Sequence, residues 1–457
     1  MWDIADSPAQ RPLYIALVES LEKAIENGDV LPGDRLPTHR DLAKKIGVTV
    51  TTITRAYAEA EKRCLVTAVV GKGTFVAGGA PVPPAPGGNA GDLPIEMGVA
   101  SPMYREEPDI TPVVERVMKK NDMTTLTRFH SPQGLPEHRE VGAGWIGRAG
   151  IKASADTVLI SAGPQHSMTS VFHAVFEAGD RIAVEQLTSP VFKSYARRTG
   201  LILEGIPLDG EGMIPEKLEE ACKSGVIRGL YTSGSLQLPG HEEASAKRRH
   251  ALARIIKQYD LVLVEDDSFN FLDTRKNRTL SSLAPHNSIY IASVSAAFYA
   301  GLRIAFIHAP SRYYSRISQG IADTIWMVSP LCAAIACECI ASGLGDRIIR
   351  NKSRELTKRT HVFKQKLQEY ETTCATNSMF AWLKLPEYWT GSGFEHAAEK
   401  SGVRVFAAEK FAVGPIVPPN SVRLVMTGPP DFPTFKKAID ILVTVLKRES
   451  GYVNLLL

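Results

Sequence analysis

The sequence has few cysteines and no long uninterrupted apolar stretch. Its six cysteines are scattered over 457 residues, and such sparse cysteines do not build the disulfide framework of a small secreted domain. No run of about 18 apolar residues occurs, so we expect no membrane-spanning helix. The first residues, Met1 to Asp3, lack the basic and apolar regions of a signal peptide. We therefore expect a cytoplasmic protein without a membrane partner.

Strong net charge and metal-binding patterns are also missing. The net charge of +4 is small for this length and neither demands nor excludes nucleic acid, so local clusters of basic residues decide that question. Cys337 and Cys339 lie close together, but they belong to an apolar helical stretch. No second cysteine or histidine pair at metal-binding spacing accompanies them. We interpret both as buried helix residues and expect no metal site.

The length and composition indicate a globular protein with more than one domain. The chain has 457 residues, with 44% apolar and 22% charged residues, which is enough for a large buried core. Residues 78–94 are rich in proline and glycine and lack apolar periodicity, which predicts a linker. We predict one domain over residues 1–77 and another over residues 95–457, with a small C-terminal α/β subdomain over about 345–457.

The first domain contains a helix-turn-helix pattern over residues 37–55. A short helix is expected over 38–46, and Gly47 permits a left-handed turn after it. Thr49 then caps a second helix. This order of elements places a second helix in a DNA major groove. An ordinary pair of packed helices is the alternative that these residues alone leave open.

The flanking sequence favours DNA binding. A helix opens at Pro12, and two short strands surround the glycines of a wing at 71–73. In order, PLY, PGDRLPTHRDLA, GVTVTTITRAY and GKGTFV resemble the winged helix-turn-helix domain of GntR-type bacterial regulators over about residues 10–78. The resemblance implies that double-stranded operator DNA is the partner. Many relatives have arginine where Val50 stands, which shifts the expected contacts to other polar residues. These are Thr38, Arg40, Thr49, Thr51, Thr52, Arg55 and Lys72.

From about residue 95 onward, apolar strands alternate with helices. Fully apolar strands are expected at 158–160 and 261–264, with a helix after Gly163 that continues to about Ala178. This pattern predicts a mostly parallel sheet that is buried on both faces. Ligands of such sheets bind at the carboxyl ends of the strands, where Asp266 and Ser293 fall. For the small α/β subdomain we predict strands at 379–385, 403–406 and 422–426 and helices at 394–401 and 432–447.

The order of motifs in the large domain resembles the fold-type I aminotransferase module, and the whole chain resembles MocR-type regulators. In that family a lysine in the motif S-x-S-K-x-x-x-P-G-L-R forms a Schiff base with pyridoxal phosphate. Here the stretch 293–303 reads SVSAAFYAGLR, and Ala296 stands at the lysine position. An alanine methyl group cannot form an aldimine. We therefore expect no catalytic residue, no covalently bound cofactor and no enzymatic activity.

Further positions of the cofactor site also depart from the family pattern. Leu238 and Pro239 replace an Asn-Pro pair, Phe269 replaces a tyrosine, and Ser189 replaces a ring-stacking aromatic residue. Phe129 replaces a tyrosine that often reaches the phosphate of a partner subunit. Each loss removes a contact worth about 1 kcal/mol. Since about 1.4 kcal/mol is a factor of ten in affinity, the resemblance implies a degenerate cofactor site.

Several groups of the site are nevertheless present. The resemblance assigns Asp266 to the pyridine nitrogen and Arg423 to the carboxylate of a ligand. It also implies a phosphate-binding cup at the start of a helix, made by Ser293, Ser295, Arg303, Gly163 and Gln165. Ordinary strand-end polar residues and structural ion pairs are the alternative for these positions. With these groups the pocket can hold a small anionic effector, or pyridoxal phosphate weakly and non-covalently.

The sequence thus predicts a DNA-binding transcription regulator whose aminotransferase-like domain forms a homodimer and senses a small anionic ligand. Three alternatives stay open at this point. The chain is a pyridoxal-phosphate-responsive regulator with an engineered change from lysine to Ala296, or an aminotransferase with an accessory domain. In the third alternative, the chain is a regulator whose large domain only forms the dimer and binds no ligand.

Overall fold

The computed structural model describes most of the chain. The described residues are 12–26, 29–30, 34–62, 65–69, 73–76, 93–233, 244–269, 271–272, 279–414 and 416–448. Lys72, Leu238, Pro239 and almost all of the predicted linker lie outside them. Within these ranges no helix is long and apolar enough to cross a membrane.

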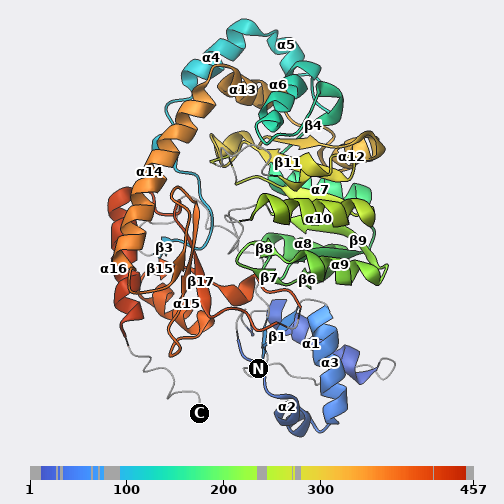
Figure 1. Ribbon diagram of the computed structural model, residues 1–457, viewed down its shortest axis with the longest axis vertical. Coiled ribbons are helices and arrows are strands. Elements are labelled where there is room, and N and C mark those ends of the chain that lie inside the picture. Colours follow the sequence, from blue (N-terminus) through green and yellow to red (C-terminus); the bar gives the residue numbers. More distant parts are fainter. Residues whose placement is uncertain are drawn as a thin grey trace.

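The N-terminal elements form a winged helix-turn-helix unit, shown in blue in Figure 1. Its elements are α1 (Leu13–Glu26), α2 (His39–Ile46), α3 (Val50–Lys62), β1 (Val66–Val69) and β2 (Gly73–Val76). The strands β1 and β2 pair antiparallel. Leu17 of α1, Leu42 of α2 and Ile53 of α3 are buried together in a core that contains residues of this unit only. The apolar face of each short helix is thereby covered, which confirms the predicted arrangement.

Local signals set the ends of α2 and α3 as predicted. Thr38 precedes α2, and its hydroxyl oxygen accepts a hydrogen bond from the Asp41 amide at 3.2 Å. Gly47 ends α2 in the left-handed region at φ 72°. Thr49 accepts a hydrogen bond from the Thr52 amide at 3.2 Å at the start of α3. These caps satisfy backbone groups that a short helix cannot pair within itself.

The large domain is built on a seven-stranded sheet of order β4-β12-β11-β10-β9-β5-β6. Its strands are β4 (Val158–Ser161), β5 (Arg181–Glu185), β6 (Ile202–Ile206), β9 (Ile227–Thr232), β10 (Val262–Asp266), β11 (Ser288–Ser293) and β12 (Ala305–His308). β12 is antiparallel to both neighbours, and the remaining pairs are parallel. The prediction of a mostly parallel sheet is confirmed.

Helices cover both faces of this sheet. Adjacent residues of β10 show this, because Val264 packs with α7 (Pro164–Val175), α8 (Pro190–Thr199) and α12 (Ser311–Ile325). Leu263 packs on the other face, with α9 (Pro215–Lys223) and α10 (Ala246–Gln258). The other elements of this domain are η1 (Tyr104–Glu106), α4 (Thr111–Lys120), α5 (Met123–Leu126), α6 (Pro136–Gly147), η2 (Ala155–Thr157), β7 (Leu208–Asp209), β8 (Gly212–Met213), α11 (Leu280–Leu283), η4 (Ala300–Leu302) and α13 (Pro330–Ala341).

The helix that follows Gly163 is shorter than predicted. It ends at Val175 instead of continuing to Ala178, because Phe176 is extended at φ −121° and ψ 157°. The Phe176 ring packs into the core beside Phe172, with ring centroids 5.1 Å apart. Burial of this ring outweighs the helical pattern of the local sequence.

The small C-terminal subdomain contains an antiparallel sheet of order β13-β14-β17-β16. Its strands are β13 (Thr372–Thr373), β14 (Phe380–Lys384), β16 (Phe406–Ala407) and β17 (Ser421–Val425). Its helices are α14 (Leu344–Lys366), α15 (Gly391–Lys400) and α16 (Phe432–Leu446), with η5 (Ala408–Lys410) before Phe411. Figure 1 shows these elements in orange and red beside the central sheet.

The strand predicted at 403–406 is two strands in different sheets. β15 (Val403–Arg404) pairs parallel with β3 (Ile95–Glu96), whereas β16 pairs with β17. The chain changes its pairing partner at Val405, which a continuous apolar stretch does not reveal. The first residues after the linker are therefore part of the small subdomain, although the predicted boundary near residue 345 leaves them out.

Candidate DNA-binding surface and candidate ligand pocket

The surface of α2 and α3 presents most of the residues predicted to contact DNA. The exposed ones are Thr38, Arg40, Thr49, Thr51 and Arg55. Thr52 is half-buried, and Lys72 lies outside the described residues. The structure thus places two arginines and three threonines on the water-facing side of one helix-turn-helix. Arginine in this position can contact phosphates or base edges.

Two of the threonines also have a structural role. The Thr38 hydroxyl donates to the Asp41 carboxylate at 2.5 Å, and the Thr49 and Thr52 hydroxyl oxygens are 2.9 Å apart. These bonds shape the two helix starts. We therefore expect Arg40, Thr51 and Arg55 to dominate direct contacts with DNA.

A brace between α2 and α3 was missed by sequence reasoning. The His39 ring stands edge-on to Tyr57 with centroids 4.8 Å apart, and its Nδ1 atom is 3.1 Å from the Thr54 hydroxyl oxygen. The Tyr57 hydroxyl donates to the Pro37 carbonyl at 2.8 Å. These bonds fix the angle between the helices, and their partners are up to 20 residues apart in sequence.

Asp266 lies at the carboxyl end of β10, where the sequence predicted a ligand site. The Ser268 amide donates to its Oδ1 atom at 3.1 Å, and the hydroxyl groups of Ser268 and Tyr231 are further hydrogen-bond partners. Removal from water raises the pKa of the Asp266 carboxyl to about 6, and the bonds from Ser268 partly oppose this rise. The carboxyl group is mainly ionised at neutral pH.

The two acidic neighbours of Asp266 have structural partners. Glu265 accepts hydrogen bonds from the amides of Leu280 and Ser281 at 3.1 and 2.8 Å, at the start of α11. Asp267 accepts a hydrogen bond from the Tyr290 hydroxyl. Asp266 is therefore the member of this acidic triplet that is best placed to meet a ligand.

The strand ends also bring residues of the predicted anion cup close together. Ser161 of β4 pairs with Ala305 of β12, and Ala305 pairs with Ser293 of β11. This brings the turn at Gly163 close to Arg303. Gly163 has φ 83°, and a Cβ atom there would clash with the Arg303 guanidinium. The start of α7 and an exposed cation thus lie side by side, as an anion site requires.

The serines of this cup are buried and partly used by the backbone. The Ser295 amide donates to the Ser293 hydroxyl oxygen at 3.1 Å, and the Ser295 hydroxyl lies 3.5 Å from the Ile304 carbonyl. Gln165 is exposed on the first turn of α7. The structure therefore brings all the predicted cup residues to one edge of the sheet.

A lysine does lie close to Ala296, but it comes from another element. The Nζ atom of Lys352 on α14 is 3.3 Å from the Ala296 carbonyl oxygen and 2.7 Å from the Glu107 carboxylate. Only 2% of the Lys352 side chain is exposed. Burial lowers the pKa of its amine, and Glu107 partly opposes that change. Both contacts of the Lys352 amine are with groups of the protein, so it is held by Glu107 and the Ala296 carbonyl.

Arg423 is a buried cation between two aromatic rings. Its guanidinium carbon lies 4.9 Å from the centre of the Phe380 ring and 4.5 Å from that of Phe411. The residue is 7% exposed, and its Nη2 atom donates to the Gly98 carbonyl at 2.9 Å. Burial lowers the pKa of the guanidinium to about 9, so it stays charged at neutral pH. Among the described residues no acidic side chain pairs with Arg423, and its Nε atom has no acceptor.

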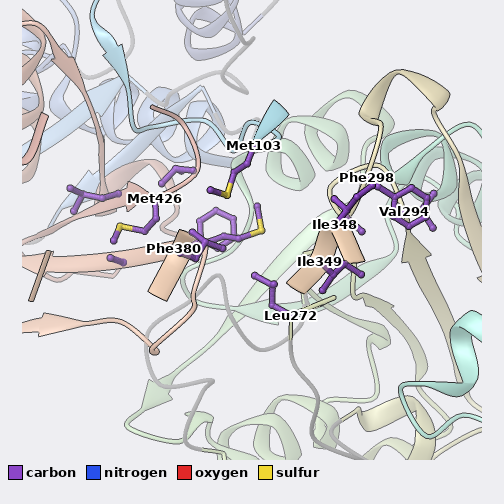
Figure 2. Close-up of a cluster of buried hydrophobic side chains, with 14 of the residues drawn as sticks. Met103, Leu272, Val294, Phe298, Ile348, Ile349, Phe380 and Met426 are labelled. Carbon is purple, nitrogen blue, oxygen red and sulfur yellow. The ribbon is translucent and has the colours of Figure 1, made fainter. Parts of the chain in front are cut away.

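Aromatic packing links Arg423 to the Asp266 loop. Phe269 meets the Phe380 ring edge-on, with centroids 5.5 Å apart, and Phe380 lies against Arg423. Figure 2 shows Phe380 beside Met103, close to Met426. Two further altered positions that the structure describes, Ser189 and Phe129, are not part of this contact chain. Ser189 precedes α8, and Phe129 is 82% exposed, with its ring 6.3 Å from that of Trp326.

The two parts of the chain match two known families. Residues 13–76 match the family described as bacterial regulatory proteins, gntR family. Residues 95–438 match aminotransferase class I and II. The HTH-type transcriptional regulator YdeF of Bacillus subtilis is 30% identical over 97% of this chain and 96% of its own length. The chain belongs to the gntR family of bacterial regulatory proteins, in the group that carries an aminotransferase domain.

Other comparisons agree with this placement. The vitamin B6 salvage pathway transcriptional repressor PtsJ of Salmonella typhimurium is 24% identical over 90% of this chain and 93% of its own length. The solved structure of LysN, an α-aminoadipate aminotransferase of Thermus thermophilus, has a TM-score of 0.68 at 21% identity. That match covers 78% of this chain and 92% of LysN. This gntR-family protein is thus a DNA-binding transcription regulator whose large domain has the aminotransferase fold.

Proposed function

We propose that this gntR-family regulator acts in the cytoplasm as a homodimer and senses a small anionic ligand that it holds without a covalent bond. In this proposal the aminotransferase-like domain has no enzymatic activity, because Ala296 offers no amine and Lys352 is held by Glu107. The winged-helix unit binds operator DNA through α3. Ligand binding then shifts the population of DNA-binding arrangements.

The ligand is assigned by the charges of the candidate site residues. Arg303, the start of α7 and the serines of the cup suit a phosphate group, and Asp266 suits a ring nitrogen that carries a proton. Arg423 suits a carboxylate. The observation that carries the proposal is that Arg423 is buried and charged while the described residues supply no acidic partner. A buried unpaired charge strongly destabilises a protein, and an anionic ligand supplies the missing partner.

The residues fit a pyridoxal-type ligand in part. A phosphate suits the cup, where Gly163 leaves room for the Arg303 guanidinium. Pyridoxal phosphate itself has no carboxylate for Arg423 and finds no amine at Ala296. A better fit is a molecule that combines a phosphate, a pyridine ring and a carboxylate. N-(5′-phosphopyridoxyl)-L-leucine, which is bound in the LysN structure, has these three groups and needs no Schiff base.

A calorimetric titration tests the proposal with a pair of probes. We expect N-(5′-phosphopyridoxyl)-L-leucine to bind about 100-fold more tightly than pyridoxamine 5′-phosphate, which lacks the carboxylate. Arg423→Met should remove this preference. Arg181→Met is the control, because Arg181 pairs with Glu204 at the start of β5, the opposite end of the sheet from Asp266. Equal affinities for the two probes, or no binding of either, contradict the proposed ligand.

A further inference from the structure

The segment that follows the linker is held against the small subdomain along its length. Ile95 and Glu96 pair with β15, and the Glu96 carboxylate lies 3.2 Å from the Arg404 guanidinium. The Met97 amide donates to the Arg404 carbonyl at 2.9 Å, and the Val425 amide donates to the Met97 carbonyl at 2.7 Å. The first described residues after the linker are therefore attached to the strand that carries Arg423.

Gly98 is the point where this segment meets Arg423. Its carbonyl oxygen accepts the bond from Arg423 Nη2 at 2.9 Å, and its amide donates to the Glu96 carboxylate at 2.7 Å. A Cβ atom at this position would lie 2.8 Å from the Phe406 ring. Three neighbours thus fix the backbone of Gly98, and one of these neighbours is Arg423, the candidate ligand-binding arginine.

The Nη2 atom is also the nitrogen that a ligand carboxylate engages. A carboxylate that binds arginine through two parallel hydrogen bonds uses either the Nε and Nη2 pair or the Nη1 and Nη2 pair. Both pairs use one N–H group of Nη2, and the other N–H group of this nitrogen is the one that can hold the Gly98 carbonyl. A bound carboxylate offsets the charge of the guanidinium, so the bond to the Gly98 carbonyl loses part of the charge assistance that an unpaired cation gives.

We propose that Arg423 couples ligand binding to the segment 95–99, so that an arriving carboxylate loosens its attachment. This inference rests on the proposed function, because it describes how the same pocket regulates the protein. The loosened residues continue directly into the linker and the winged-helix unit. Arg423 thereby acts as a positioning residue for the chain that leads to the DNA-binding domain.

The residues that follow the segment 95–99 stay anchored when Gly98 is released. Arg105 lies 3.0 Å from the Asp431 carboxylate, and Glu107 lies 2.7 Å from Lys352. Met103 is buried in the apolar cluster around Phe380, as Figure 2 shows. These contacts hold residues 103–107, so a change at Gly98 is passed toward the linker and not toward the large domain.

Hydrogen–deuterium exchange on the full-length, ligand-free protein tests the coupling without any ligand. We expect Arg423→Met to speed amide exchange at residues 95–99 by about tenfold, because one charge-assisted hydrogen bond to the segment is lost. Arg423→Lys keeps a cation and a donor and should restore part of the protection. Arg105→Gln is the control, since it removes an exposed ion pair that lies a few residues after the segment 95–99. Unchanged exchange in Arg423→Met overturns the inference, provided that its melting curve shows a folded protein.

The second arm adds the two probes to the wild-type protein. We expect N-(5′-phosphopyridoxyl)-L-leucine to speed exchange at residues 95–99 and pyridoxamine 5′-phosphate to leave it unchanged. Binding of the leucine adduct without a change in exchange overturns the inference. If calorimetry shows that the adduct does not bind, the proposed ligand is wrong, and the ligand-free arm decides the coupling alone.

Discussion

The DNA-facing helices and the ligand pocket use charged side chains in opposite ways. Arg40 and Arg55 are exposed on the winged-helix unit, where water solvates them in the absence of DNA. Arg423 is buried between aromatic rings, and Asp266 is crowded by Ser268 and Tyr231. An exposed charge contributes little to stability, whereas a buried charge without an opposite charge is destabilising. The charges of α3 are therefore stable without a partner, whereas the described residues leave Arg423 without an opposite charge.

The largest expected effect comes from removing the buried cation. Arg423→Met should weaken binding of N-(5′-phosphopyridoxyl)-L-leucine by roughly 3 kcal/mol, since the carboxylate loses its partner. The same change should raise the free energy of unfolding of the ligand-free protein by about 1–3 kcal/mol, because an apolar side chain replaces an unpaired buried charge. Calorimetry and urea denaturation measure the two effects. A loss of stability on substitution would show that the contacts of Arg423 with Gly98, Phe380 and Phe411 outweigh the cost of its buried charge.

A slightly smaller effect is expected at Asp266. Its pKa rises from 3.8 in the unfolded chain to about 6 in the folded protein. The folded state thus binds the proton more tightly, so this residue destabilises the protein above pH 6 and less so as the pH falls toward 4. Asp266→Asn should raise the free energy of unfolding at pH 8 by at most about 3 kcal/mol. Denaturation curves at pH 8 and pH 5 check this.

The expected gain from Asp266→Asn shrinks at pH 5, where the wild-type carboxyl is largely protonated. Glu185 and Glu265, whose pKa values burial raises to about 7, remain in both proteins and cancel in the comparison. An equal gain at both pH values would contradict the assigned pKa.

An exposed arginine should act on DNA binding alone. Arg55→Ala should weaken binding to the DNA upstream of the protein's own gene by about tenfold. It should also lower the number of counterions released on binding, which the salt dependence reports, by about one. The free energy of unfolding should change by less than about 0.5 kcal/mol. Lys23→Ala is the control, because Lys23 is exposed on α1, away from the turn. Gel shifts at several salt concentrations give the DNA affinity and its salt dependence. Unchanged DNA binding in Arg55→Ala would contradict the placement of α3 in the major groove.

The smallest effect separates backbone strain from packing. Gly47 has φ 72° and open space around a Cβ atom, so Gly47→Ala should destabilise the winged-helix unit by about 1 kcal/mol through strain alone. Gly144→Ala, also in open space but within α6, should instead stabilise the protein by about 0.5–1 kcal/mol. Thermal melts compare the two. A change of melting temperature in the same direction in both variants would contradict the assignment of the Gly47 effect to its left-handed backbone.

The same comparison explains what the sequence could predict. The helix-turn-helix depends on Thr38, Gly47 and Thr49, which act on residues close to them in sequence. The predictions for Gly47 and Thr49 are confirmed, whereas Thr38 caps α2 instead of beginning it. The central strands were also predictable, because their apolar residues are continuous. The order of motifs indicated where Asp266, Arg303 and Arg423 lie, but not which groups surround them.

Contacts between distant residues could not be predicted. The Arg423 bond to Gly98 spans 325 residues, and the Lys352 bond to Glu107 spans 245. The pairing of β3 with β15 also joins distant residues, which is why the apolar stretch 403–406 predicts one strand where the structure has two. Such contacts form only when residues that are far apart in sequence pack together, and no local sequence pattern predicts them.

The most direct test of the account is the affinity of the full-length protein for its upstream DNA, measured with and without saturating N-(5′-phosphopyridoxyl)-L-leucine. A coupling of about 1–3 kcal/mol predicts a shift in DNA affinity of roughly 5- to 150-fold for the wild-type protein. Arg423→Met should bind DNA without responding to the ligand. The same DNA affinity in the wild-type protein with and without bound ligand would contradict the claim that the pocket regulates DNA binding.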